Sequence, residues 1–416
     1  MSTHDRSPAS QPPSRRRFLG AAAALSATLA APSIVGAQAR RALRVSVGRQ
    51  PYAAGNSPVT QHMMAQRIFE RIGATMGYDL TVDYRDYPSA LPMVEAFISG
   101  NLDFGMWGNT PIVRLIAQDQ PIVPLTVGEG HLRFVIAVRR GSPLRTLQDL
   151  RGKTVGALLG GDPYNALSQI LRHELGNGDP RAHGITVVNT PTQAQAATIP
   201  TGMDAAVVIY PAYLKANAEI GTTGIMNSFG YTEANYRGPA GEGAGHLIES
   251  VRRSPFFPDG YYLHRSFWVT RPAVIRDHAP MVTAFLMAQQ EAVAELAAMN
   301  PGAVSELVKN YWGLPPEQGG LVVQDDVLFK RGWCWPTEGD ATAVLEISKV
   351  MVEGRIIERP LAWAQIRRAF EPCVPMMRDA YERTGRRPDA AAFEAQNAQD
   401  LRGLPVWDLQ RWRDRT

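Results

Sequence analysis

The chain has 416 residues, of which 45% are hydrophobic and 20% charged, so it has the composition of a soluble globular protein long enough for two domains. Its two cysteines exclude a disulfide-rich scaffold and a cysteine-based metal site. The formal net charge of +4 owes much to residues 1–39, which carry four arginines and one aspartate, so nucleic acid is not an implied partner.

Residues 1–39 have the pattern of a twin-arginine signal peptide. The run 14–19 reads SRRRFL, a mild run rich in Ala, Leu and Thr follows, and AQA at 37–39 offers a cleavage site. A membrane anchor is the alternative, but the apolar run breaks at Pro32 and is too short and alanine-rich to span a bilayer. We therefore expect export of a folded protein to the periplasm, without a lipid anchor.

After the leader, predicted strands and helices alternate. Apolar strands are predicted at 43–48, 80–84, 102–106 and 122–127, and helices at 57–76, 90–99 and from 110 onward. Such alternation predicts a mostly parallel sheet with helices on both faces.

The pattern restarts with a strongly apolar strand at 134–138. A second α/β unit follows. It is predicted to contain a short helix within 142–152, strands at 153–158, 185–189 and 203–210, and helices that end at 175, lie near 193 and begin at 211. Residues 229–260 are rich in Gly, Pro, Tyr and Arg, which predicts a lid, a binding loop or a disordered segment. A strand at 262–270 follows, and the remainder is predicted to be helical up to a polar tail.

The stretch 99–113 organises the rest of the chain. Its tip, Trp107-Gly108-Asn109, follows a short buried strand, and Thr110 and Pro111 are predicted to cap and begin the next helix. In a parallel α/β sheet such a tip lies at the carboxyl end of a strand, where ligands bind. The alternative is an ordinary turn with a packed tryptophan.

A second tip of this kind occupies residues 159–164. Asp162 and Pro163 are predicted to cap and begin a helix, and a carboxylate there uses the positive helix end that an anion would otherwise occupy. Aromatic residues at the predicted tips form a candidate stacking platform, with a role in the core as the alternative: Tyr52, Trp107, Tyr164 and Tyr210.

The order of several motifs resembles one family. They are GNLDFG at 100–105, GNTP at 108–111, GSPLRTLQDLRGKTV at 141–155, GMDA at 202–205, YPAY at 210–213, NP at 300–301 and EGRI at 353–356. The chain resembles the solute-binding proteins of ABC importers for nitrate, sulfonates and taurine, and the related binders of thiamine-pyrimidine precursors. It departs from them in the length of 229–260 and in Asp162, where sulfonate binders typically have small hydroxyl residues.

The resemblance implies an α/β, two-lobe periplasmic binding protein fold of type II-like character, with an interlobe ligand cleft and a helical C-terminal extension. The expected division is a signal peptide at 1–39, lobe 1 at 40–133, lobe 2 at 134–261, a return to lobe 1 with C-terminal helices at 262–385, and a polar tail at 386–416. The implied partners are an inner-membrane permease and its ATPase, and a monomer is expected.

The expected function is capture of a small organic solute, either sulfonate- or taurine-like or a ring-containing acid. An anion requires Arg49 or Arg133 to offset Asp162. No catalytic motif stands out, and no metal or cofactor is expected. The alternatives are an exported enzyme on the same fold and a binder of a thiamine-pyrimidine precursor. Pairing of Cys334 with Cys373 is left open. The expected ligand-binding residues are Gln50, Tyr52, Trp107, Asn109, Thr110, Gly161, Asp162, Tyr164 and Tyr210.

Overall fold

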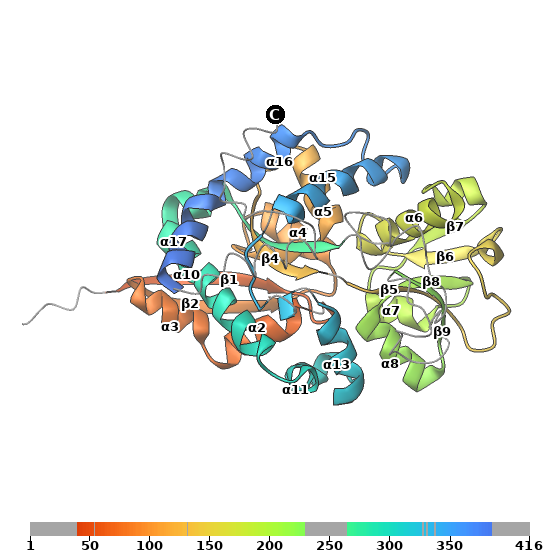
Figure 1. Ribbon diagram of the computed structural model, residues 1–416, viewed down its shortest axis with the longest axis horizontal. Coiled ribbons are helices and arrows are strands. Elements are labelled where there is room, and N and C mark those ends of the chain that lie inside the picture. Colours follow the sequence, from red (N-terminus) through yellow and green to blue (C-terminus); the bar gives the residue numbers. More distant parts are fainter. Residues whose placement is uncertain are drawn as a thin grey trace, which may run out of the picture. The chain divides into compact units, whose positions relative to one another are not determined.

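The computed structural model in Figure 1 describes residues 40–384 except 54, 131, 229–263, 327, 330–331 and 337. The leader, the segment 229–260 and the polar tail expected from the sequence therefore lie outside the described residues. Among the described helices, none is long and apolar enough to cross a membrane.

The first two strands form a parallel pair. β1 (Arg41–Arg49) pairs with β2 (Tyr78–Asp86) along its whole length. The connection contains two helices, α2 (Asn56–Ala65) and α3 (Ile68–Thr75), where the sequence predicted one. The break falls at Arg67, whose φ of 49° is left-handed. Apolar periodicity continues across the break because α3 still buries Ile68 and Phe69, so the pattern did not reveal it.

A second sheet has the order β3-β10-β4. Its strands are β3 (Gly105–Trp107), β4 (Val123–Gly130) and β10 (Arg265–Thr270), and β10 is antiparallel to both neighbours. The connecting helices are α4 (Ala90–Ile98) and α5 (Asn109–Ala117). The predicted mostly parallel sheet is wrong here, because the central strand comes from a distant part of the chain that the local alternation did not include.

The third sheet is built from one continuous stretch, in the order β7-β6-β8-β5-β9. β6 runs parallel to β7 and β8, whereas β5 is antiparallel to β8 and β9. Within the predicted helix at 142–152, only η1 (Gln148–Leu150) is helical. The remaining elements are β5 (Phe134–Val138), β6 (Thr154–Ala157), α6 (Asp162–Leu175), η2 (Pro180–His183), β7 (Thr186–Asn189), α7 (Gln193–Thr198), β8 (Ala205–Ile209), α8 (Tyr210–Ile220) and β9 (Thr223–Asn227).

The C-terminal part of the described chain is helical, as predicted. α10 (Pro272–Ala297) is kinked at His278, two residues before Pro280, and it packs against α2, α3 and α17. Asn300 caps α11 through the Gly302 N–H, at 2.9 Å. The other helices are α11 (Pro301–Glu306), α12 (Lys309–Trp312), α13 (Pro316–Asp325), α15 (Glu338–Glu353), α16 (Trp363–Phe370), η3 (Glu371–Cys373) and α17 (Val374–Thr384).

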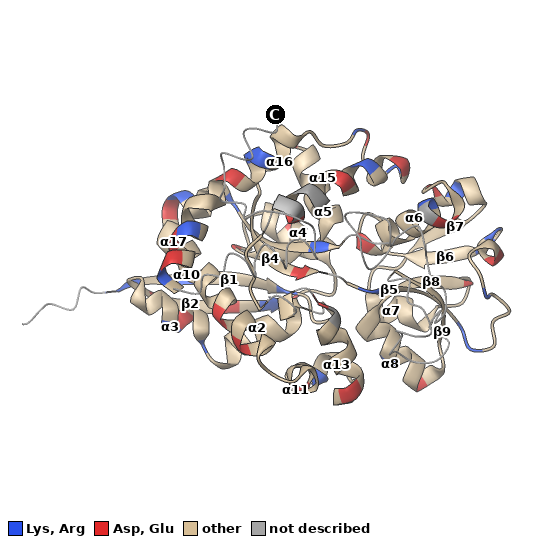
Figure 2. Cartoon of the chain, viewed as in Figure 1, with Lys and Arg blue, Asp and Glu red and all other residues tan. Residues whose placement is uncertain are grey.

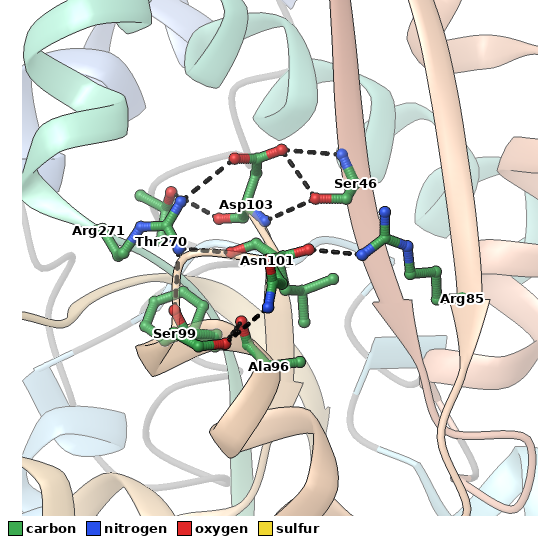
Figure 3. A network of polar contacts seen from close by, with 10 residues as sticks. Ser46, Arg85, Ala96, Ser99, Asn101, Asp103, Thr270 and Arg271 are labelled. Carbon is green, nitrogen blue, oxygen red and sulfur yellow. Dashed lines mark hydrogen bonds and ion pairs between the residues drawn. The ribbon is translucent and has the colours of Figure 1, made fainter.

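A polar network around Asp103 fixes the organising stretch to the rest of the fold (Figure 3). One carboxylate oxygen of Asp103 accepts hydrogen bonds from the backbone N–H and the hydroxyl of Ser46 in β1, at 2.9 and 2.8 Å. Arg271 donates to the other carboxylate oxygen and to the carbonyl of Leu102. Thr270 donates to the Asp103 carbonyl at 2.9 Å. The strand entering the tip is therefore held by β1 and by the junction of β10 and α10.

Both cysteines are free and fully buried. Burial raises the pKa of each thiol strongly, because the thiolate loses its hydration in an apolar surrounding.

Candidate ligand-binding cavity

A cavity of about 600 Å³, its open mouth included, is lined by residues that follow β1 and β2 of the first sheet and by residues in or next to strands of the second and third sheets. The described residues that line it are Gln50, Pro51, Tyr52, Ala53, Tyr87, Pro88, Ser89, Ala90, Met106, Gly108, Glu129, Leu132, Phe134, Leu158, Gly161, Asp162, Pro163, Gln193, Ile209, His264 and Ser266.

Asp162 occupies the meeting point of two helices. It is the first residue of α6, with Gly161 as the N-cap, and its Oδ1 accepts a hydrogen bond from the backbone N–H of Thr110 in α5 at 3.0 Å. The predicted cap roles of Asp162 and Thr110 are therefore corrected: Gly161 caps α6, Gly108 caps α5, and Asp162 binds the N-terminus of α5. The two helices are also joined by Asn165, which donates to the Thr110 hydroxyl at 3.1 Å.

Glycine at position 108 is required for this approach. A Cβ placed on Gly108 would lie 2.1 Å from Asp162 Oδ2 and 2.7 Å from His264 Nε2. No side chain fits there without displacing the carboxylate or the imidazole. The backbone of the organising stretch thus borders the cavity through Gly108.

Glu129 brings a second carboxyl group to the cavity wall. It lies in the fully buried strand β4 and is 1% exposed. Its Oε2 accepts a hydrogen bond from the Gly55 N–H at 3.3 Å. The pKa of Glu129 is raised well above its usual value, chiefly by burial and then by the nearby charge of Asp326, which is itself buried. Glu129 therefore holds its proton at pH values where an exposed glutamate has lost it.

His264 lies beside Asp162 in a fully buried position. Burial lowers the pKa of its imidazole to about 4, against the opposing effect of Asp162, so the ring is neutral at pH 7. Its Nε2 lies 3.9 Å from Asp162 Oδ2 and 3.2 Å from the Ser266 hydroxyl. A Ser-His-Asp relay places serine and aspartate on opposite ring nitrogens. Here both face the same nitrogen, so these three residues are not arranged for nucleophilic catalysis.

Four of the predicted ligand-binding residues line the cavity, namely Gln50, Tyr52, Gly161 and Asp162. Gln50 also supports the tip, because its side-chain amide donates to the Met106 carbonyl at 2.7 Å.

The other five predicted residues are absent from this lining. Trp107 is fully buried, and its ring packs edge-on against Phe97 at 5.1 Å between centroids. Asn109 and Thr110 are also fully buried, at the start of α5. The position of Trp107 follows from strand alternation, which points its side chain into the core while leaving the backbone of the next residue at the cavity.

The two remaining tyrosines serve other contacts. Tyr210 is 1% exposed, and the guanidinium of Arg133 lies 4.0 Å from its ring centroid. Tyr164 is half-buried and donates its hydroxyl to the Gly354 carbonyl at 3.2 Å, beside a different cavity. The predicted four-residue aromatic platform is therefore not assembled in this cavity, where Tyr52 alone of the four is a lining residue.

The two arginines that could have offset the charge of Asp162, Arg49 and Arg133, make other contacts. Arg49 is 3% exposed, pairs with Asp86 at 3.3 Å and donates to the hydroxyl of Tyr311 at 3.0 Å. Arg133 stacks over Tyr210, as described above. The described residues lining the cavity include neither arginine nor lysine.

The sequence analysis missed Glu129, His264 and Ser266. One signal was present for Glu129: it is the acidic residue in an otherwise uncharged strand, β4. Figure 2 shows acidic and basic residues on many of the helices, whereas a carboxyl in a strand whose residues are all buried is exceptional. His264 and Ser266 gave no such signal, because only the fold brings the start of β10 beside α6.

Comparison with known proteins gives a family match over part of the chain and a shared fold over most of it. Residues 52–198 match the family model described as the periplasmic substrate-binding protein of a phosphonate ABC transporter. No curated protein sequence matches the chain significantly. The structure resembles the periplasmic aliphatic sulphonate-binding protein SsuA from Escherichia coli, with 18% identity, 79% of this chain and 91% of that chain covered, and a TM-score of 0.54.

Two further solved structures share the fold. The periplasmic nitrate-binding protein NrtA from Synechocystis PCC 6803 has 12% identity, covers 89% of this chain and 97% of its own, and gives a TM-score of 0.57. The desulfurization enzyme DSZB has 12% identity, covers 82% and 99%, and gives a TM-score of 0.53. The resemblance inferred from the sequence is confirmed as a resemblance: the chain has the periplasmic binding protein fold, and its residues 52–198 match a family model of substrate-binding proteins of ABC importers. The fold by itself does not separate a binder from an enzyme, because DSZB shares it.

Within the described part of the chain, no group of three or more His, Cys, Asp or Glu residues is placed to hold a metal ion.

Proposed function

We propose that this protein is the solute-binding component of an ABC importer and that its cavity takes a small organic solute whose polar edge donates hydrogen bonds, such as an amine, an amidine or an amino-substituted ring. The observation that carries the proposal is the polar chemistry of the described lining. It contains the carboxyl groups of Asp162 and Glu129 and the neutral imidazole of His264, and no arginine or lysine.

Charge disfavours a compact anion in this cavity. An anion about 4 Å from the Asp162 carboxylate is repelled by roughly 4 kcal/mol at an effective dielectric constant near 20. That penalty corresponds to about three powers of ten in affinity. A cationic or N–H-rich group is attracted instead, because the carboxylate of Asp162, a lining residue, is a charged hydrogen-bond acceptor.

The apolar lining suits a flat molecule. Tyr52, Tyr87 and Phe134 all border the cavity, and Leu132, Leu158 and Ile209 add aliphatic surface. Aromatic rings bind planar ligands by offset or edge-on stacking, which leaves the rim of the ligand free for hydrogen bonds. A ring-containing solute fits this lining better than nitrate or a short alkanesulfonate, although a taurine-like solute also carries an amine.

The cellular setting follows from the same class. We infer that the protein is exported to the periplasm through the twin-arginine signal at 1–39, binds its solute as a monomer, and delivers it to an inner-membrane permease energised by an ATPase. No covalent chemistry is part of this proposal, since His264 and Ser266 lack a relay geometry.

Calorimetry and thermal shift of the ligand-free mature protein test the ligand class. The probes are 4-aminopyrimidine, benzamidine, taurine, ethanesulfonate, methylphosphonate and nitrate. We expect micromolar binding of at least one of the two nitrogen-rich ring compounds. Replacing Asp162 by Asn should weaken that binding at least about tenfold, because a charged hydrogen bond becomes a neutral one.

Asp204→Asn is the matched control, since Asp204 also accepts a backbone N–H, from Thr154 at 2.8 Å, but does not line the cavity. Binding of ethanesulfonate, methylphosphonate or nitrate with no response to either ring compound would overturn the ligand class. Chemical conversion of a bound probe, detected by mass spectrometry, would instead support the enzyme alternative.

A further inference from the structure

The N-terminus of α5 is directed at a side chain in the first turn of α6. α5 begins at Asn109 and α6 begins at Asp162. Its Oδ1 accepts the Thr110 N–H of α5, while the residue itself occupies the first turn of α6. Each helix N-terminus carries a partial positive charge, and backbone N–H groups there bind anions.

The carboxylate of Asp162 is largely buried and is closely surrounded by other groups. Its side chain is 12% exposed, Gly108 leaves room for Oδ2, and His264 Nε2 lies 3.9 Å from that oxygen. The same carboxylate also lines the cavity. The carboxylate of Asp162 thus occupies the place at the helix N-terminus where a free anion would otherwise bind.

We infer that Asp162 is a built-in anion that sets the ligand specificity of the cavity, by filling the junction of α5 and α6 and thereby excluding anionic solutes. This inference rests on the proposed role of the cavity as a solute site. Removing the carboxylate, while leaving the two helix N-termini in place, converts the junction into a site for a free anion. Removing only its charge does not, because the amide still fills the space.

Asp162→Ala tests the inference, with formate as the replacement for the missing carboxylate and sulfate as a larger probe. Thermal shift and calorimetry are performed at constant ionic strength, set with sodium chloride, so that general salt effects cancel. We expect formate to raise the melting temperature of Asp162→Ala selectively. We also expect formate to bind this variant at least about tenfold more tightly than it binds the unmodified protein, in keeping with the strength of charge interactions at partly buried helix ends.

Asp162→Asn is expected to gain less formate affinity than Asp162→Ala, because it loses the charge repulsion but its amide still fills the junction. Asp204→Ala is the second control, as it removes a carboxylate from a backbone N–H outside the cavity. Asp162→Ser provides a second vacancy variant that retains a hydroxyl for helix capping if Asp162→Ala does not fold.

Three results overturn the inference: anion binding by the unmodified protein at this junction, an equal response of Asp162→Asn or Asp204→Ala, or a folded vacancy variant that responds to neither anion. The unmodified protein supplies the first of these measurements whether or not the variants fold. The outcome is separable from the proposed ligand class, since the gain of formate binding is measured without any nitrogen-rich ring compound.

Discussion

Glu129 shows how one residue can link the cavity to pH. Its pKa is raised by burial and by Asp326, so between pH 4.5 and its folded pKa the native state holds a proton that the unfolded state has released. The contribution of this group to stability is therefore complete at low pH and is lost as the pH rises through the folded pKa. Glu129→Gln removes this pH-dependent loss of stability, because glutamine does not titrate.

We expect the melting temperature of Glu129→Gln to match that of the unmodified protein near pH 4.5 and to exceed it by a few degrees at pH 8. Differential scanning calorimetry across this pH range measures the difference. Glu95→Gln, an exposed substitution on α4, serves as the control and should give no pH-dependent difference. A constant offset for Glu129→Gln at all pH values would contradict the titration account.

Trp107 tests the assignment of the organising stretch to the core. Because its ring is fully buried against Phe97, Trp107→Ala should lower the free energy of unfolding by about 3–5 kcal/mol through loss of packing and creation of a cavity. Urea denaturation measures the change. Trp363→Ala, at a half-buried tryptophan, should cost less. A cost below about 1 kcal/mol for Trp107→Ala would show that the ring is not a core group.

At the scale of elements, the break between α2 and α3 stores backbone strain. Arg67 adopts φ 49° and ψ 41°, which costs a residue with a Cβ about 1 kcal/mol relative to glycine. Its ion pair with Glu70 spans 3.5 Å and leaves Arg67 74% exposed, so losing it matters little. We expect Arg67→Gly to raise the free energy of unfolding by a few tenths to about 1 kcal/mol in urea denaturation.

Arg71→Gly is the contrasting variant, since position 71 lies inside α3, where glycine costs about 1 kcal/mol. Equal destabilisation by both glycines would show that the turn at Arg67 is unstrained.

These elements also show what the sequence can and cannot predict. β5 matches its predicted bounds because its apolar run and the flanking turns define both ends. The fold class was recognisable because several motifs follow one order. The sequence predicted only some of the lining residues of the cavity. Turn residues pointed to Gly161 and Asp162, whereas His264 comes next to them only because β10 pairs with distant strands. The side-chain direction of Trp107 depended on strand alternation at a three-residue strand, which is too short for the pattern to decide.

For the molecule as a whole, the two buried thiols report on global opening. Cys334 and Cys373 are both fully buried, and burial raises the pKa of each, so neither supplies thiolate to a reagent in the native state. We expect a mass-detected alkylation assay at pH 8 to label neither cysteine in the native protein and both in denaturant, with no reductant needed. Labelling that requires a reductant after denaturation would show that the two cysteines are paired.

The sheet order β3-β10-β4 has a consequence for how the chain acquires its structure. β3 and β4 are separated by 15 residues, yet each pairs with β10, which begins at Arg265. The five strands of the third sheet, by contrast, all lie between Phe134 and Asn227. During synthesis the later-made sheet can close while the earlier one still lacks its middle strand, and such long-range pairing slows folding. β3 and β4 are thus synthesised before the third sheet, but their own sheet can be completed only after the third sheet has been synthesised.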